Sequence, residues 1–107
     1  MIIATTDELG DRKIVEVLGL VRGNAVRSRH IGKDIVAGFK NIVGGEVHEY
    51  TKLLAEVREQ AIDRMVAEAV ALGADAILAM RFASTEISSG AAEFMAYGTA
   101  VKLAAVE

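Results

Sequence analysis

The chain has 107 residues and a net charge of −3, from 12 basic and 15 acidic side chains. It contains no cysteine, which excludes disulfides and thiolate metal sites, and no long basic run, which argues against nucleic-acid binding. About 60% of the chain consists of apolar residues and glycine (Ala, Val, Ile, Leu, Met, Phe and Gly), against roughly 45–50% in ordinary soluble domains. No stretch approaches the roughly 20 consecutive apolar residues of a membrane span. We therefore expect one cytoplasmic domain, residues 1–107, that assembles with copies of itself.

The first predicted element is a strand over Lys13–Arg22, which is rich in β-branched and aliphatic residues. Apolar side chains occupy both of its alternating faces, so we expect both faces to be buried. Gly19 interrupts one face and predicts a bulge or the close approach of another backbone. The following stretch, Ala25–Ile31, is expected to be extended or looped.

Two helices are predicted next. Lys33–Val43 has apolar residues at the spacing of one helical face, and Gly44-Gly45 ends it. From Glu46 to Leu72 the spacing of three or four residues predicts a long amphipathic helix. Its apolar stripe consists of Val47, Tyr50, Leu54, Val57, Ala61, Met65 and Ala69. A helix of this length must pack along strands of its own chain or along a neighbouring subunit.

The remainder of the chain predicts a β-hairpin. Ala76–Ile87 alternates, with Leu78, Met80 and Phe82 expected on one face, and Ser88-Ser89-Gly90 is typical of a turn before a strand within Ala91–Val106. The order strand, helix, helix, strand, strand predicts an α+β domain, with an antiparallel sheet packed on the long helix.

Candidate ligand sites are few. His30 and His48 are the only possible nitrogen ligands for a metal ion, and a zinc site needs at least three protein ligands. A metal site within one chain is therefore disfavoured, although an oligomer could bring copies of either histidine together. Gly44-Gly45 precedes a helix N-terminus, a natural anion site, but the end of the preceding helix already explains both glycines.

The most polar concentration is the stretch Arg27–Asp34, which contains Arg29 and His30. Its arginines could hold a carboxylate or phosphate. We favour the alternative that they form intersubunit salt bridges with the acidic face of the long helix. The serines have no convincing His-Asp arrangement around them, so a hydrolase is not expected.

Five motifs resemble the YbjQ family of bacteria and archaea. The motifs are VRSRHIGKDI with AGFKNIVGGE over residues 26–46, GLVRGN over 19–24, Tyr50-Thr51, LGADA over 72–76 and AYGTAV over 96–101. The resemblance implies a small α+β fold of the dodecin-subunit type and a ring-shaped homopentamer. The family is sometimes labelled heavy-metal-binding. This sequence has no cysteine and only two histidines, so it gives no support for a soft-metal site.

These observations together predict a non-catalytic homo-oligomer, pentameric by the resemblance, with no cofactor and no nucleic-acid or membrane partner. Some polar and glycine residues are expected to stabilise subunit contacts or to line a site for an unknown small ligand. They are Arg27, Arg29, Asp34, Gly44, Gly45, Glu46 and Tyr50. The alternative is a protein that binds a divalent metal ion at subunit boundaries through His30 and His48.

Overall fold

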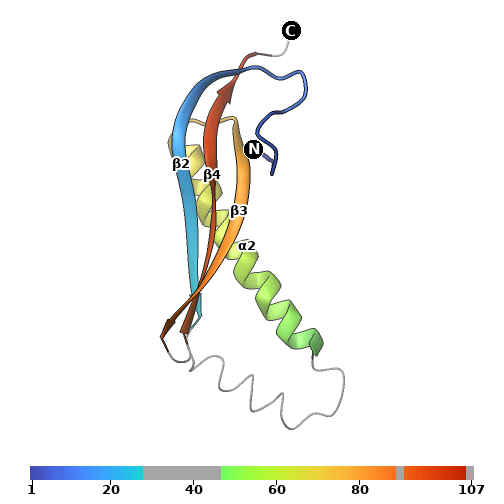
Figure 1. Ribbon diagram of the computed structural model, residues 1–107, viewed down its shortest axis with the longest axis vertical. Coiled ribbons are helices and arrows are strands. Elements are labelled where there is room, and N and C mark those ends of the chain that lie inside the picture. Colours follow the sequence, from blue (N-terminus) through green and yellow to red (C-terminus); the bar gives the residue numbers. More distant parts are fainter. Residues whose placement is uncertain (28–46, 89–90, 106–107) are drawn as a thin grey trace.

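The fold is α+β, as predicted, with one long helix packed on a four-stranded sheet (Figure 1). A computed structural model describes residues 1–27, 47–88 and 91–105. The helix expected over Lys33–Val43 and most of the turn expected at Ser88–Gly90 lie outside this part of the chain. The described elements are β1 (Ile2–Ile3), β2 (Ile14–Arg27), α2 (Val47–Ala71), β3 (Ala76–Ser88) and β4 (Ala91–Leu103).

The sheet is mixed, so the prediction of a purely antiparallel sheet was wrong. Its strand order is β1-β3-β4-β2, and β2, β4 and β3 pair antiparallel. The short β1 pairs parallel with the start of β3, Ile2 opposite Ala76. Two residues are too few to show an alternating pattern, which is why the sequence did not predict β1.

Strand β2 continues five residues beyond its predicted end and is irregular near its start. The residues Ala25–Arg27 are therefore strand. The pairing of β2 with β4 shifts between Val17 and Gly19, and Gly19 has a φ of 117°, so the predicted bulge is confirmed. The expected burial of both faces was wrong, because Val15, Val17 and Leu20 are 57%, 66% and 60% exposed.

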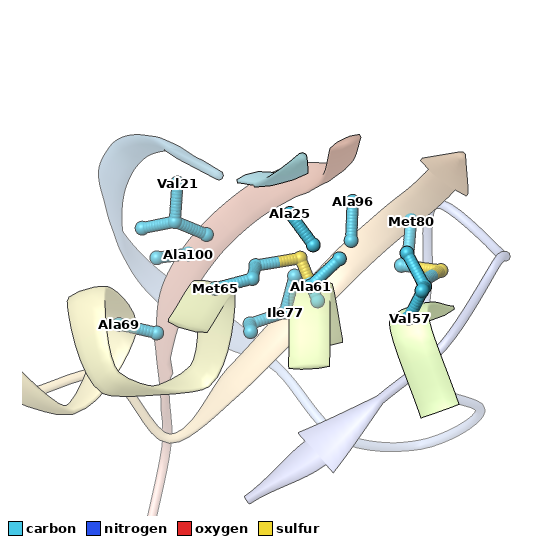
Figure 2. Packing of buried hydrophobic residues seen from close by; sticks show 10 residues of the cluster. All are labelled: Val21, Ala25, Val57, Ala61, Met65, Ala69, Ile77, Met80, Ala96 and Ala100. Atoms are coloured by element: carbon cyan, nitrogen blue, oxygen red, sulfur yellow. The ribbon is translucent and has the colours of Figure 1, made fainter. Parts of the chain in front are cut away.

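Helix α2 packs on the sheet through the predicted stripe. Val57, Ala61, Met65 and Ala69 are fully buried and contact small and aliphatic residues of the strands (Figure 2). The helix ends where predicted, with Gly73 in the left-handed conformation and the Ala74 N–H bonded to the Ala69 carbonyl. At 25 residues it is about 37 Å long. Its amino-terminal half extends beyond the strands (Figure 1).

Glycines allow the closest contacts of the fold. A Cβ at Gly23 of β2 would overlap the backbone of α2 at Ala61 and Met65. A Cβ at Gly98 of β4 would lie 2.6 Å from Ile77 Cγ2 and 2.9 Å from the Leu78 carbonyl oxygen. Helix and sheet are therefore in direct backbone contact at Gly23, which no larger residue would permit.

A bulge in β3 changes which side chains face the helix. The register shifts between Leu78 and Arg81, where Ala79 has a φ of 53°. Leu78 and Met80 consequently lie in two different clusters, so their predicted placement on one face was wrong. Met80 belongs to the core beneath α2, and Leu78 to a second cluster on the opposite face.

The amino-terminal segment covers this second cluster. Ala4 and Leu9 pack on it, and the Ala4 N–H donates to the Ile77 carbonyl. The Ala79 N–H donates in turn to the Thr6 carbonyl. Residues 1–13 thus occupy one end of the face opposite α2, together with the adjoining edge of β3.

Candidate interaction surface

Most residues singled out in the sequence fall outside the described ranges. Arg29, His30, Asp34, Gly44, Gly45 and Glu46 all lie between β2 and α2, within residues 28–46. Arg27 is the last residue of β2 and is opposite Ala92 of β4. His48 and Tyr50 lie in the first turn of α2.

No group of three or more His, Cys, Asp or Glu residues that could hold a metal ion occurs within residues 1–27, 47–88 and 91–105. In the same ranges, no helix is long and apolar enough to cross a bilayer. In the described part of the chain, the candidate contact surfaces are one face of the sheet and one edge of the sheet. A few side chains also form hydrogen bonds with backbone groups.

The sheet face opposite α2, here called the open face, carries two arginines and a tyrosine in one row. Tyr97 of β4 is opposite Arg22 of β2 on one side and Arg81 of β3 on the other. Directly opposite residues of an antiparallel pair share a face. Both arginines are exposed, and Arg81 donates from Nη1 to the Thr5 carbonyl oxygen at 2.9 Å. This row makes the middle of the open face positive.

Exposed apolar side chains accompany this row along β2. Leu20 and Val26 are opposite Thr99 and Glu93 of β4, on the same face as Arg22, and are 60% and 52% exposed. On the helix side of β3, Phe82 is opposite the buried Ala96 and is 45% exposed. Apolar groups of this size gain free energy when a partner removes them from water.

Strand β2 also forms an edge of the sheet, since the strand order ends with it. An edge strand presents unpaired N–H and C=O groups, and proteins usually protect such an edge by keeping it short or by adding Lys, Pro or a cover. β2 has 14 residues and no Lys or Pro. Within the described ranges, α2 provides one side-chain hydrogen bond to the backbone of β2, which the exposed Arg64 donates to the Asn24 carbonyl.

Asp75 joins the end of α2 to the sheet. Its Oδ2 accepts a hydrogen bond of 2.9 Å from the Leu103 N–H of β4, and its own N–H donates to the Val101 carbonyl. The side chain therefore completes the backbone pairing where β1, β3 and β4 meet. Asp75 belongs to the motif LGADA, so this contact gives that motif a structural role.

We expect Asp75→Ala to lower the free energy of unfolding by about 1–2 kcal/mol, because the Leu103 N–H loses its acceptor. Asp75→Asn keeps an oxygen acceptor and should cost less. Urea denaturation of the three proteins at equal concentration measures the difference. Equal stabilities for Asp75→Ala and the parent would show that water replaces the carboxylate without loss.

Comparisons with known proteins agree on one family. The profile of the YbjQ family, described as "Putative heavy-metal-binding", matches residues 1–104. The chain belongs to the YbjQ family. A UPF0145 protein of Archaeoglobus fulgidus is 53% identical over 103 residues, which cover 96% of this chain and 95% of that protein. A UPF0145 protein of Thermosipho melanesiensis is 56% identical with the same coverage.

A more distant solved structure shares the fold of this YbjQ chain. It is a protein of unknown function of the DUF74 family from Pediococcus pentosaceus, with a TM-score of 0.63 and 14% sequence identity. The match covers 97% of this chain and 98% of that one. At this identity the likeness supports the architecture alone.

Sequence reasoning did not identify the open face of this YbjQ domain. Arg22 was predicted as the end of the first strand and belongs to the motif GLVRGN, Tyr97 belongs to the motif AYGTAV, and Arg81 falls in a predicted strand, but nothing in the pattern brought the three together. The alternating pattern could have placed Arg22 with Leu20 and Val26, since these positions are two or four apart. The position of Arg81 could not be deduced, because the bulge at Ala79 shifts the alternation before it.

Proposed function

We propose that this YbjQ protein is a non-catalytic, cytoplasmic homo-oligomer, a pentameric ring whose subunit contacts cover the exposed apolar groups. The observation that carries the proposal is the 14-residue edge strand β2, which has no Lys or Pro, has no strand paired to its outer edge within the described residues, and carries exposed apolar side chains. Leu20 and Val26 are both more than half exposed. Within the described residues no strand pairs with this edge, and a second copy of the chain would protect it from non-specific pairing.

We further propose that the polar motif residues of the family lie at the subunit boundary. Arg27 is the carboxyl-terminal residue of β2, so the motif over residues 27–34 begins where the edge strand ends. We assign Arg27, Arg29, Asp34, Glu46 and Tyr50, with Gly44-Gly45, to subunit contacts or to a small-ligand site beside them. Salt bridges with exposed acids of α2, such as Glu56, Glu59 and Asp63, fit the charges of the two elements.

Native mass spectrometry at micromolar concentration tests the proposal. We expect a complex with several times the 11.4 kDa mass of one chain, and five copies if the ring is a pentamer. A monomer under these conditions would contradict self-assembly, and another copy number would contradict only the pentamer. The same spectrum reports any small molecule that the protein retains through purification.

A second candidate function is metal binding at subunit boundaries, and the family description favours it. His30 and His48 are its nitrogen ligands, and an ion would need copies of them from more than one chain. Spectra recorded after incubation with zinc, nickel or copper distinguish the two functions. A metal adduct that is lost in both His30→Ala and His48→Ala would support metal binding. Adducts that persist in both variants, or that never form, would count against it.

A further inference from the structure

We propose that Arg22, Tyr97 and Arg81 form a binding site on the open face for the phosphate group of a small molecule. All three residues belong to one copy of the chain, so the site does not depend on self-assembly. It is also separate from the ligand site proposed beside residues 27–50, because its residues come from the middle of β2, β4 and β3.

A bulge in β3 brings Arg81 into this row. Between Leu78 and Arg81 the strand has one residue more than the facing part of β4, which runs from Thr99 to Tyr97. Without the extra residue, Met80 would be opposite Tyr97, and Arg81 would be on the helix side of the sheet. Bulges are frequent beside functional sites, where they redirect a side chain in this way.

The bulge has a strained backbone that neighbouring residues hold in place. Ala79 has a φ of 53°, which residues other than glycine rarely adopt. Such strain persists only where the surrounding structure enforces it, and it concentrates at active sites and ligand sites. The amino-terminal segment enforces it here, since the Ala79 N–H donates to the Thr6 carbonyl and the Met80 N–H donates to the Ala4 carbonyl. The position of Arg81 is therefore built into the fold at a cost.

The Arg81 side chain is oriented by backbone acceptors and still has donors to offer. Its Nη1 donates to the Thr5 carbonyl oxygen at 2.9 Å and to the Met80 carbonyl oxygen at 2.8 Å. Within the described residues its Nε and Nη2 groups have no protein acceptor, and the side chain is exposed. A guanidinium that is already oriented loses less conformational freedom when a ligand binds.

The row carries positive charge with no acid close to it on the sheet. Arg22 is exposed, and adjacent strands are about 4.8 Å apart, so the two arginines begin about 10 Å apart with Tyr97 between them. The nearest acid in the adjoining rows is Glu93, which lies two rows away. The rows on either side of Tyr97 contain only neutral residues, namely Leu20, Thr99 and Leu78, and Asn24, Met95 and Ala83.

These donors fit a phosphate group better than other anions. Each guanidinium can donate to phosphate oxygens through two parallel N–H groups, and the Tyr97 hydroxyl can donate to a further oxygen. A carboxylate has only two oxygens and a single charge to share among the three side chains. A nucleic acid is disfavoured, because the chain has a net charge of −3. The ligand class is therefore a phosphorylated small molecule.

Calorimetric titration at low ionic strength tests the site, with inorganic phosphate and pyrophosphate as probes and acetate as the carboxylate control. Arg22→Gln removes one guanidinium, and we expect it to raise the Kd for pyrophosphate at least about tenfold, as the loss of a charge-assisted hydrogen bond implies. Arg58→Gln is the matched control, since Arg58 is exposed on α2 and its removal changes the net charge equally. It should leave the Kd unchanged.

Two further variants test the remaining members of the row. Tyr97→Phe removes the hydroxyl alone and should raise the Kd about threefold or more. Arg81→Gln should weaken binding as Arg22→Gln does. It also removes the hydrogen bond to Thr5, so urea denaturation must accompany it, and Arg22→Gln remains the decisive variant because Arg22 is on another strand.

Several results would overturn the phosphate site. Equal weakening in Arg22→Gln and Arg58→Gln would show general electrostatic attraction, and parental affinity in Arg22→Gln would place binding elsewhere. A parent that binds neither phosphate nor pyrophosphate, or that binds acetate equally well, would contradict the assigned ligand. None of these results bears on the copy number measured by native mass spectrometry, so the site can fail while the proposed function stands.

Discussion

Gly23→Ala is expected to lower the free energy of unfolding by about 3 kcal/mol or more, although it adds only one methyl group. The added Cβ would overlap backbone atoms of α2 at Ala61 and Met65, and backbone cannot rotate away as a side chain can. The helix must therefore move off β2, and the buried stripe beneath it loses contacts along its length. Urea denaturation at a fixed protein concentration measures the loss, because self-association would make stability depend on concentration.

Gly10→Ala is the control for this substitution. Gly10 has a φ of 53°, and no atom lies within 4 Å of the added Cβ. Gly10→Ala should therefore lower the free energy of unfolding by about 1 kcal/mol, because alanine is strained in the left-handed conformation. If Gly23→Ala costs no more than Gly10→Ala, helix and strand are not in backbone contact. The two variants thus separate crowding from backbone strain.

Met65→Ala has the next largest expected effect, a loss of about 2–5 kcal/mol. Met65 is fully buried and is one of the largest side chains in the core, where it packs in one cluster with residues of β2, β3 and β4 (Figure 2). Removal leaves a cavity that neighbouring alanines, such as Ala61 and Ala69, are too short to fill. Thermal or urea unfolding measures the change.

Val70→Ala is the matched control on the same helix. Val70 is 60% exposed, and its truncation should change stability by no more than about 0.5 kcal/mol. A loss of less than 1 kcal/mol for Met65→Ala would mean that the core beneath α2 repacks freely, contrary to the close packing of most protein interiors.

The helical part of the fold could be predicted because its signal is long and periodic. The stripe through Val57, Ala61, Met65 and Ala69 repeats every three or four residues, and all four side chains are buried as expected. Gly73 ended the helix as predicted. The hairpin of β3 and β4 was also predicted, since alternating apolar residues flank turn chemistry at Ser88–Gly90.

The sheet was predicted less well, for reasons of local geometry. Ala79 adopts a positive φ without being glycine, so nothing in its identity indicated the bulge that separates Leu78 from Met80. The apolar pattern of β2 predicts burial on both faces, but Val17 and Leu20 are exposed, and β2 is at an edge of the described sheet. Composition indicates how much apolar surface a chain has, but not whether its own strands or another copy covers it.

The candidate site was the least predictable part. The family motifs concentrate polar residues in 27–34 and at 44–50, which mostly lie outside the described ranges. The row of Arg22, Tyr97 and Arg81 unites residues from three strands, and its members are separated by up to 75 positions of sequence. Only the strand order and register bring them together.

The strand order also has a consequence for synthesis on the ribosome. β4 is central in the sheet, between β3 and β2, yet it is the last of the described elements to be made. In the described sheet β2 pairs with β4 alone, and β3 pairs with β4 and with the two-residue β1, so most of the pairing of β2 and β3 must wait, with apolar side chains in water, until residues 91–103 have been made. Premature termination anywhere before residue 91 would thus remove the strand that joins the sheet, and the fragment would present β2 unpaired, and β3 paired only with the short β1, to the cell's chaperones and proteases.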